Sequence, residues 1–211
     1  MNSVRVVCHQ LAPRIGDAEY NRTLSAQAIR SAAALGAQVV VLPELAQSGY
    51  VFTDTQEALR VSEPLDGPTL TLWKTLANSL NIIVVAGFCE RLTATQVANS
   101  AALIEPHGRL TVYRKAHLWD RETLICTPGT EPPPVVETAV GRIAVMICYD
   151  PELPEWVRLA ALAGADLLCA PVNWPDGPRP AGERPAEIVR VQANAAVNRL
   201  FIAACDRHGE E

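Results

Sequence analysis

The sequence predicts an α/β fold, in which helices cover the faces of β-sheets. Two observations lead to this fold class. Short apolar runs rich in valine, isoleucine and leucine alternate along the chain with longer segments whose apolar residues recur near helical spacing. One pair of these runs is separated by Pro106-His107-Gly108, which has the composition of a hairpin turn. Such an alternation is typical of sheets that are covered by helices.

The helices follow from apolar spacing and from residues that mark helix ends. Asp17 is a suitable N-cap for a helix that continues to Ala34, and Gly36 stands where a C-terminal glycine usually closes a helix. Further helices are expected over residues 69–80, 153–163 and 183–198.

The strands follow from nearly continuous apolar runs, which indicate strands that are buried on both faces. They are expected at residues 4–10, 38–42, 82–89, 97–105 and 109–113, near Val135, in the run that ends at Cys148, and at residues 166–171 and 200–205. Residues 127–134 form a proline-rich connection. Residues 175–185 have the composition of a loop, and we expect them to form a wall or lid of a pocket because they follow a strand end.

Composition excludes several classes of protein. A chain of 211 residues with 49% hydrophobic and 19% charged residues fits one soluble globular domain over residues 1–211. The net charge of −5, without a basic stripe, argues against nucleic acid as a partner. No apolar run is long enough to span a bilayer, so no membrane partner is expected. The absence of GxGxxG after the first strand, and of GxxxxGK[ST] anywhere, argues against a nucleotide-binding domain.

The six cysteines favour a reducing compartment. Most of them lie in or beside apolar runs, where a free cysteine behaves as a small buried hydrophobe; these are Cys8, Cys89, Cys148, Cys169 and Cys205. The N-terminus, MNSVRVVCHQLAP, is typical of a strand rather than of a secretion leader, so we expect a cytoplasmic protein. No CxxC pair and no His–Cys cluster at zinc spacing occurs, so no metal is expected.

Three strand ends carry residues that are suited to catalysis. Cys148 ends the apolar part of RIAVMICYDPELPE, Glu44 follows VVVLP, and Lys115 follows LTVYR. Ligands collect at the carboxyl ends of strands in open α/β sheets. A cysteine placed there with a carboxylate and an ammonium group is suited to covalent catalysis. Each residue also has an ordinary interpretation: a core thiol, a solvated or capping acid, and a surface lysine.

In these motifs the chain resembles the nitrilase superfamily, the carbon–nitrogen hydrolases, over nearly its whole length. The family signatures are a glutamate in LPE, a lysine in YRKxHL, and a cysteine followed by YD and then PE. They stand here as Leu42-Pro43-Glu44, as residues 113–118, and as Cys148-Tyr149-Asp150 with Pro154-Glu155. Flanking matches are Asn99-Ser100, Pro128-Gly129 and Gly141-Arg142. The resemblance implies the four-layer αββα sandwich of that family.

The resemblance also implies roles for the three residues. Cys148 is the expected nucleophile, and Glu44 the general base that takes the thiol proton and later activates water. Lys115, with the backbone N–H of Tyr149, is expected to stabilise the oxyanion. Glu122 matches a second pocket glutamate that orients the amide and the lysine, although a solvated acid is a close alternative.

Further residues are expected at the substrate, again by resemblance. Asn173 and Trp174 follow the strand after Cys148, where the family often has pocket residues. Tyr50 is a candidate for the same pocket, with ordinary packing as an equal alternative. His117 is expected to brace the lysine loop, and Asp150 to hold the loop after the nucleophile.

The implied reaction is hydrolysis of a small aliphatic or ω-amide to a carboxylic acid and ammonia, with water as the second substrate and no cofactor. Cys148-Tyr149-Asp150 is similar to the amidase-type branches. Three alternatives stay open: an N-carbamoyl amine or amino-acid amidohydrolase, a nitrilase, and a catalytically silent scaffold. Relatives continue with further strands beyond the position of Ala204. The resemblance therefore implies that this chain, which ends at Glu211, lacks the C-terminal strands of the family. It also implies a homodimer or larger homo-oligomer.

Overall fold

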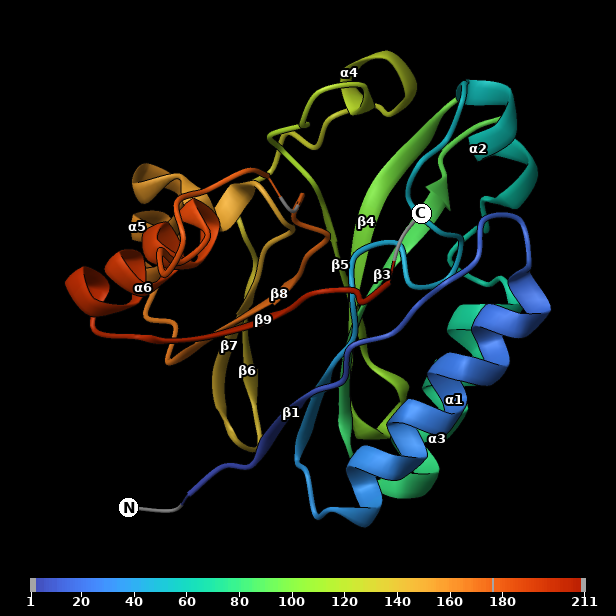
Figure 1. The fold of residues 1–211 in the computed structure, drawn as a ribbon. Coiled ribbons are helices and arrows are strands. Elements are labelled where there is room, and N and C mark those ends of the chain that lie inside the picture. Colours follow the sequence, from blue (N-terminus) through green and yellow to red (C-terminus); the bar gives the residue numbers. More distant parts are fainter. Residues whose placement is uncertain (1–2, 176, 210–211) are drawn as a thin grey trace.

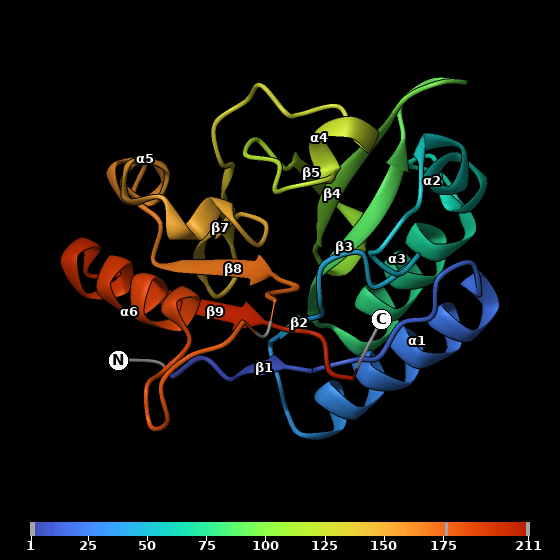
Figure 2. The same cartoon turned by 45° about the horizontal axis from the view of Figure 1, so that its top comes forward.

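A computed structural model describes residues 3–175 and 177–209 of the chain. It contains two β-sheets that lie between two pairs of helices, with α1 and α3 on one side and α5 and α6 on the other (Figure 1). Figure 2 shows the same layers in a second view, with α5 and α6 on the left and α1 on the right. The α/β class and the αββα order are thereby confirmed.

The first sheet has the strand order β1-β2-β3-β4-β5. These strands are β1 (Val6–Cys8), β2 (Val39–Val41), β3 (Ile83–Arg91), β4 (Val97–Ile104) and β5 (Leu110–Arg114). β1, β2 and β3 pair in parallel, whereas β3, β4 and β5 are antiparallel. The predicted hairpin turn is confirmed as a short 3₁₀ segment, Pro106–Gly108. The helices that cover this first sheet are α1 (Ala18–Ala34) and α3 (Pro68–Leu80).

The second sheet has the strand order β6-β7-β8-β9. These strands are β6 (Val135–Thr138), β7 (Gly141–Val145), β8 (Leu167–Pro171) and β9 (Phe201–Cys205), and the helices beside them are α5 (Pro154–Leu162) and α6 (Ala186–Asn198). A short 3₁₀ segment, Asp150–Glu152, precedes α5. β7, β8 and β9 are parallel, so the loops that follow them emerge at one edge of the sheet.

The core follows the two-residue period of the strands. Along β2, Val39 and Val41 pack in the cluster that includes residues of the second sheet, and Val40 packs in the cluster that includes α1 and α3. All three side chains are buried. A strand covered on both faces needs apolar residues at every position, which explains why the sequence run showed no alternation.

Most of the predicted elements are confirmed, with shifts of a few residues at their ends. The predicted cap of α1 is correct, because Asp17 Oδ1 accepts a hydrogen bond from the backbone N–H of Tyr20 at 3.0 Å. Gly36 follows the last residues of α1 with φ of 74°, a left-handed conformation that glycine adopts without strain.

Three features were not predicted. Helices α2 (Thr55–Val61) and α4 (Glu122–Ile125) lie in segments that are too short to show a helical period. β6 and β7 form a second hairpin, and its turn at Ala139 and Val140 carries no turn-forming residues. The prediction that a strand continues to Cys148 is wrong, because β7 ends at Val145.

The loop at residues 175–185 leaves the sheet edge after β8 and is largely exposed. Its predicted role as a wall or lid stays a prediction, and Asp176 within it lies outside the described residues, as does Glu211. Within the part of the chain that the structure describes, no helix is both long and apolar enough to cross a bilayer.

Candidate active site

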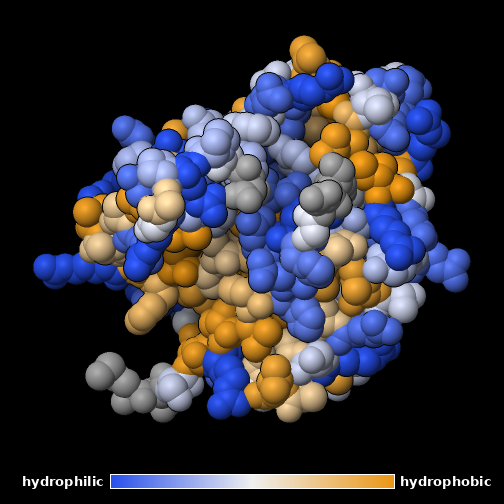
Figure 3. All heavy atoms as spheres, in the orientation of Figure 1, coloured by the Kyte–Doolittle hydropathy of each residue, from blue (hydrophilic) through white to orange (hydrophobic). Residues whose placement is uncertain are grey.

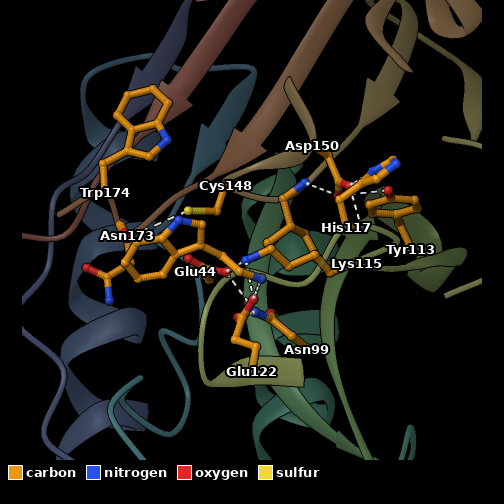
Figure 4. A network of polar contacts seen from close by, with 12 residues as sticks. Glu44, Asn99, Tyr113, Lys115, His117, Glu122, Cys148, Asp150, Asn173 and Trp174 are labelled. Carbon is orange, nitrogen blue, oxygen red and sulfur yellow. Dashed lines mark hydrogen bonds and ion pairs between the residues drawn. The ribbon is translucent and has the colours of Figure 1, made fainter. Parts of the chain in front are cut away.

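The three predicted chemical residues meet between the two sheets. Glu44 follows β2, Lys115 follows β5, and Cys148 lies just beyond β7 of the other sheet. Figure 4 shows Glu44 and Lys115 close together, with Cys148 beside them. All three are buried, with exposed fractions of 2%, 0% and 4%. A hydrogen bond of 3.3 Å from Glu44 N to Val172 O joins the loop after β2 to the loop after β8, and so holds the two sheets together at the site.

The ammonium group of Lys115 lies between two carboxylates. Its Nζ is 2.8 Å from Glu44 Oε1 and 2.7 Å from Glu122 Oε2. Asn99, on β4, donates through Nδ2 to the same two side chains, to Glu44 Oε1 at 2.7 Å and to Glu122 Oε1 at 2.6 Å. Glu122 Oε2 also accepts from the backbone N–H of Trp119 at 2.8 Å. The cluster therefore holds two carboxylates and one cation in a dry environment.

Glu44 keeps one oxygen free for chemistry. No hydrogen bond reaches its Oε2 from any residue within 3–175 or 177–209. Burial raises the pKa of Glu44 to about 7, and the charge of Glu122 adds to that rise, whereas Lys115 and Asn99 oppose it. A carboxylate with this pKa and an unused oxygen is suited to accept a proton near neutral pH.

Burial alone lowers the pKa of Lys115. The charges of Glu44 and Glu122 oppose that effect, and the pKa of Lys115 stands well above its ordinary value. The lysine therefore remains a cation while the site is closed to water. A fixed cation in a dry site stabilises nearby negative charge more strongly than it does in water.

Cys148 has an unusual backbone conformation. Its φ is 47°, in the left-handed region that residues other than glycine rarely adopt. Its N–H donates to Pro171 O at 3.0 Å, and its Sγ lies 3.6 Å from Asn173 O. Burial raises the pKa of the thiol well above its ordinary value, the charge of Glu44 adds to this, and Lys115 opposes it. The resting thiol is therefore protonated and needs a base before it can react.

Asp150 ties the cysteine loop to the lysine loop. Its buried carboxylate accepts hydrogen bonds from the Tyr113 hydroxyl at 2.8 Å and from the backbone N–H of His117 at 3.0 Å, two residues on either side of Lys115. His117 Nδ1 lies 2.7 Å from Asp150 Oδ1, and this bond raises the pKa of His117. The side chain of Asp150 also accepts from Ile147 N at 3.3 Å. The predicted bracing roles of His117 and Asp150 match these contacts.

Two glycines allow the loops to approach the sheet. A Cβ on Gly87 would collide with the backbone nitrogen of Leu45 and would lie 2.7 Å from Glu44 Cα. A Cβ on Gly129 would collide with the carbonyl of Arg114, and Gly129 N donates to Lys115 O at 2.9 Å. Glycine is needed at both positions because there the backbones themselves are in contact.

Comparison with known proteins agrees with this geometry. The model of the family described as carbon-nitrogen hydrolase matches residues 5–211. The chain belongs to the carbon-nitrogen hydrolase family. It is similar to a nitrilase of Pyrococcus abyssi, with 33% identity over 99% of this chain and 76% of the relative. It is also similar to an (R)-stereoselective amidase of Pseudomonas sp., with 34% identity over 95% of this chain and 69% of the relative.

Solved structures support the same family. A mutant of an amidase from Nesterenkonia sp. AN1, captured with acrylamide added to its active-site cysteine, aligns with a TM-score of 0.87. The identity is 28%, over 99% of this chain and 80% of the amidase chain. The same amidase was also captured with butyramide in a mutant form that aligns with a TM-score of 0.86 and 28% identity over 99% of this chain and 78% of its own. The protein is therefore a carbon-nitrogen hydrolase by family.

The residues predicted to bind substrate lie at different distances from this cluster. Asn173 touches the Cys148 thiol through its carbonyl oxygen, and Tyr149 follows the cysteine directly. Tyr50 lines a pocket together with Glu122. Trp174 lies apart from the cluster in Figure 4 and lines a separate surface depression that includes Cys205. Its backbone N–H donates to Asp206 Oδ1 at 3.1 Å.

Sequence reasoning gave Asn99 no role beyond a motif match, and it did not consider Trp119. Asn99 holds both carboxylates, and Trp119 both donates to Glu122 and lines the pocket. The position of Trp119, directly after the lysine motif, was the available signal.

Proposed function

We propose that this carbon-nitrogen hydrolase is an amidase, which converts a small amide to a carboxylic acid and ammonia through a thioester on Cys148. The observation that carries the proposal is the arrangement around Glu44. A carboxylate with an unused oxygen and a pKa of about 7 lies in one buried cluster with a cation and beside a protonated thiol.

Acylation begins with proton transfer from Cys148 Sγ to Glu44, and the sulfur attacks the amide carbon. The carbonyl oxygen becomes an oxyanion that the Lys115 ammonium and the backbone N–H of Tyr149 stabilise. The carbon–nitrogen bond then breaks, and the proton held by Glu44 passes to the leaving nitrogen, which departs as ammonia. Glu122 and Asn99 hold Lys115 and Glu44 in place through the contacts described above.

Deacylation uses the same base. Glu44 takes a proton from water, the resulting hydroxide attacks the thioester carbon, and a second oxyanion forms beside Lys115. The carbon–sulfur bond breaks and the proton returns to the thiolate. The products are the carboxylic acid and the resting enzyme, and no cofactor enters either step.

Intact-protein mass spectrometry tests the proposal. Wild type and the Cys148→Ala variant are incubated briefly with small amides, N-carbamoyl compounds and nitriles, while ammonia is assayed in parallel. We expect an acyl adduct and ammonia with simple amides, in wild type and in the control variant Cys8→Ala but not in Cys148→Ala. Product from only N-carbamoyl compounds or only nitriles overturns the amidase assignment. A folded protein that forms no adduct with any class is a silent scaffold.

We also propose that the enzyme works as a homo-oligomer. α5 and α6 expose large apolar side chains, with Leu162 76% and Val197 60% exposed. Exposed apolar patches mark protein interfaces, and we propose that these two helices form one. Analytical ultracentrifugation tests this, and a monomer at micromolar concentration overturns it.

A reducing compartment, the cytoplasm, is the proposed location. All six cysteines are free in the structure, and four of them are buried. Structural disulfides are typical of oxidising compartments. Fractionation of cells that express the protein, with detection of the intact chain, tests this location.

A further inference from the structure

A pocket beside Glu122 has no part in the mechanism above. Its volume is about 150 Å³, and it lies between the loop after Glu44 and the α4 segment. In Figure 3, hydrophobic residues gather on this face between α4 at the top and α2 at the upper right. The inner wall is formed by Leu45, Tyr50, Phe52, Ile125 and Cys126.

The pocket lies next to the reacting groups. Glu122, whose carboxylate binds Lys115, is part of its lining, and Leu45 directly follows the base Glu44. Burial raises the pKa of Tyr50, and the charges of Glu44 and Glu122 raise it further. Glu122 and Leu45 therefore connect the pocket to the Lys115 ammonium and to the Glu44 carboxylate.

The inner wall is neutral and apolar. Leu45 and Phe52 are buried aliphatic and aromatic groups, with 2% and 5% exposed. Burial raises the pKa of Cys126 to about 12, so its thiol is neutral at physiological pH. Asp120 and Arg121 are exposed, and Arg121 donates to Thr53 O at 3.0 Å. A carboxylate on the ligand would lose its water here and would face Glu122, so charged chains are disfavoured.

The size of the pocket limits what it can hold. An apolar cavity of about 150 Å³ lined by leucine, isoleucine and phenylalanine binds benzene in another protein. An acyl group of similar bulk, such as a short alkyl chain or a phenyl ring, therefore fits this pocket.

We propose that this pocket is the acyl subsite of the enzyme, and that it selects amides of unbranched aliphatic acids of about four to six carbons, or of phenylacetic acid, over ω-amides that carry a carboxylate. The proposal rests on the proposed amidase function. It assigns Phe52 and Cys126 as residues that determine specificity.

Steady-state kinetics on a chain-length series tests the subsite. The substrates are acetamide, butyramide, valeramide, hexanamide, phenylacetamide and glutaramate, whose five-carbon chain ends in a carboxylate. In wild type, kcat/KM is expected to rise at least about tenfold from acetamide to valeramide, and glutaramate to lie at least about tenfold below valeramide.

Two variants change the volume of the pocket in opposite directions. Cys126→Met fills it, and the valeramide-to-acetamide ratio of kcat/KM is expected to fall by about tenfold or more. Phe52→Leu enlarges it, and the preferred chain becomes longer. Matched controls are Cys8→Met and Phe201→Leu, at exposed positions in β1 and β9, for which the wild-type ratio is expected. Thermal unfolding verifies that each variant is folded, and Ile125→Phe replaces Cys126→Met if that variant is not.

The outcomes separate the two proposals. If folded pocket variants keep the wild-type chain-length profile while an acyl adduct still forms on Cys148, the acyl subsite lies elsewhere and the amidase function stands. A preference of wild type for glutaramate overturns the apolar class. If no amide gives ammonia or an adduct, the amidase function is wrong and the subsite fails with it.

Discussion

Two ion clusters are built on neighbouring residues at the end of β5, Arg114 and Lys115. They differ in the burial of the cation and in the number of carboxylates that it binds. Arg114 binds Glu90 through two hydrogen bonds, of 2.8 and 2.7 Å, and Ser100 donates to the same carboxylate at 2.7 Å. Lys115, the next residue, binds Glu44 and Glu122 with help from Asn99, the neighbour of Ser100. The side chain of Arg114 is 46% exposed, whereas that of Lys115 is fully buried.

Burial and the balance of charges distinguish a structural ion pair from a reactive one. In the Arg114 cluster one cation meets one carboxylate, and water reaches the guanidinium, although Glu90 itself is buried. In the Lys115 cluster one cation meets two carboxylates away from water, and one oxygen of Glu44 has no partner among the described residues. An excess of buried negative charge with an unused acceptor costs stability, and such features mark candidate functional sites.

The largest expected effect comes from neutralising Glu44 in the Lys115 cluster, and Glu90 in the Arg114 cluster is the matched comparison. Glu44→Gln is expected to lower kcat/KM for amides by roughly 10³-fold, because the base is lost. Its free energy of unfolding is expected to stay equal or rise, because a buried charge is removed. Glu90→Gln is expected to lose about 1.5–3 kcal/mol of stability, because its hydrogen bonds to Arg114 are charge-assisted.

Ammonia release and urea unfolding of both glutamine variants check this contrast. Glu90→Gln, which lies outside the Lys115 cluster, is expected to keep activity within about threefold of wild type. Equal losses of activity in the two variants would mean that the clusters do not differ in kind.

Removing the cation is the next largest change. Lys115→Met leaves two buried carboxylates without a counter-charge, so a loss of about 3–5 kcal/mol in unfolding free energy and of about a hundredfold in kcat is expected. Arg114→Met removes a half-exposed cation and leaves the buried Glu90 with the Ser100 hydroxyl, so a smaller loss of about 1.5–3 kcal/mol is expected. Equilibrium unfolding in urea and steady-state kinetics measure both quantities. A Lys115→Met protein as stable as Arg114→Met contradicts the burial argument.

The pKa of Glu44 predicts opposite trends of activity and stability with pH. Because this pKa is raised from 4.5 to about 7, kcat/KM is expected to increase as pH rises through about 7, where the base ionises. Over the same interval the folded state holds a proton that the unfolded chain has released, so stability falls between the unfolded and the folded pKa.

The checks for this trend are a pH–rate profile of wild type and unfolding of wild type and Glu44→Gln from about pH 5 to about pH 8. Stability of wild type is expected to fall relative to the variant as pH rises. A rate profile that is flat through neutral pH would falsify the assignment of Glu44 as the base.

The smallest expected effect is at the link between the lysine and cysteine loops. Tyr113→Phe removes a hydroxyl that donates to Asp150 at 2.8 Å and accepts from Trp156 Nε1 at 2.9 Å, so a loss of about 1 kcal/mol is expected. Asp150 keeps its bonds to His117 and Ile147, and kcat is expected to fall by about threefold. Thermal unfolding and kinetics test this, with Tyr20→Phe as the control. An unchanged stability of Tyr113→Phe contradicts the link.

Much of the fold was readable from local pattern. The cap at Asp17 and the closing Gly36 act within a few residues of α1, so sequence proximity is enough to predict them. The end of β7 was misplaced because Met146 and Ile147 are apolar whether or not they lie in a strand. The helix α4, which carries Glu122, is too short to show a period.

The candidate site was predicted through motifs, not through spatial proximity. Glu44, Lys115 and Cys148 were chosen because each follows an apolar run at a strand end, and the resemblance to family signatures then implied their chemical roles, which stay predictions. Asn99 was recorded only as a flanking match, because a neutral amide in a strand gives no signal until its partners are known. The walls of the pocket, such as Phe52 and Cys126, come from segments that no motif marks.

The alternation of strands and helices and the residue types at the strand ends follow from the sequence alone, since both depend on the local order of side chains. Three features appear only once the chain is folded: one cation faces two carboxylates, Glu44 keeps a free oxygen, and its pKa is raised to about 7. Desolvation and Coulomb interactions depend on distance in space and on burial. Both are fixed when the two sheets pack against each other, which no local segment encodes.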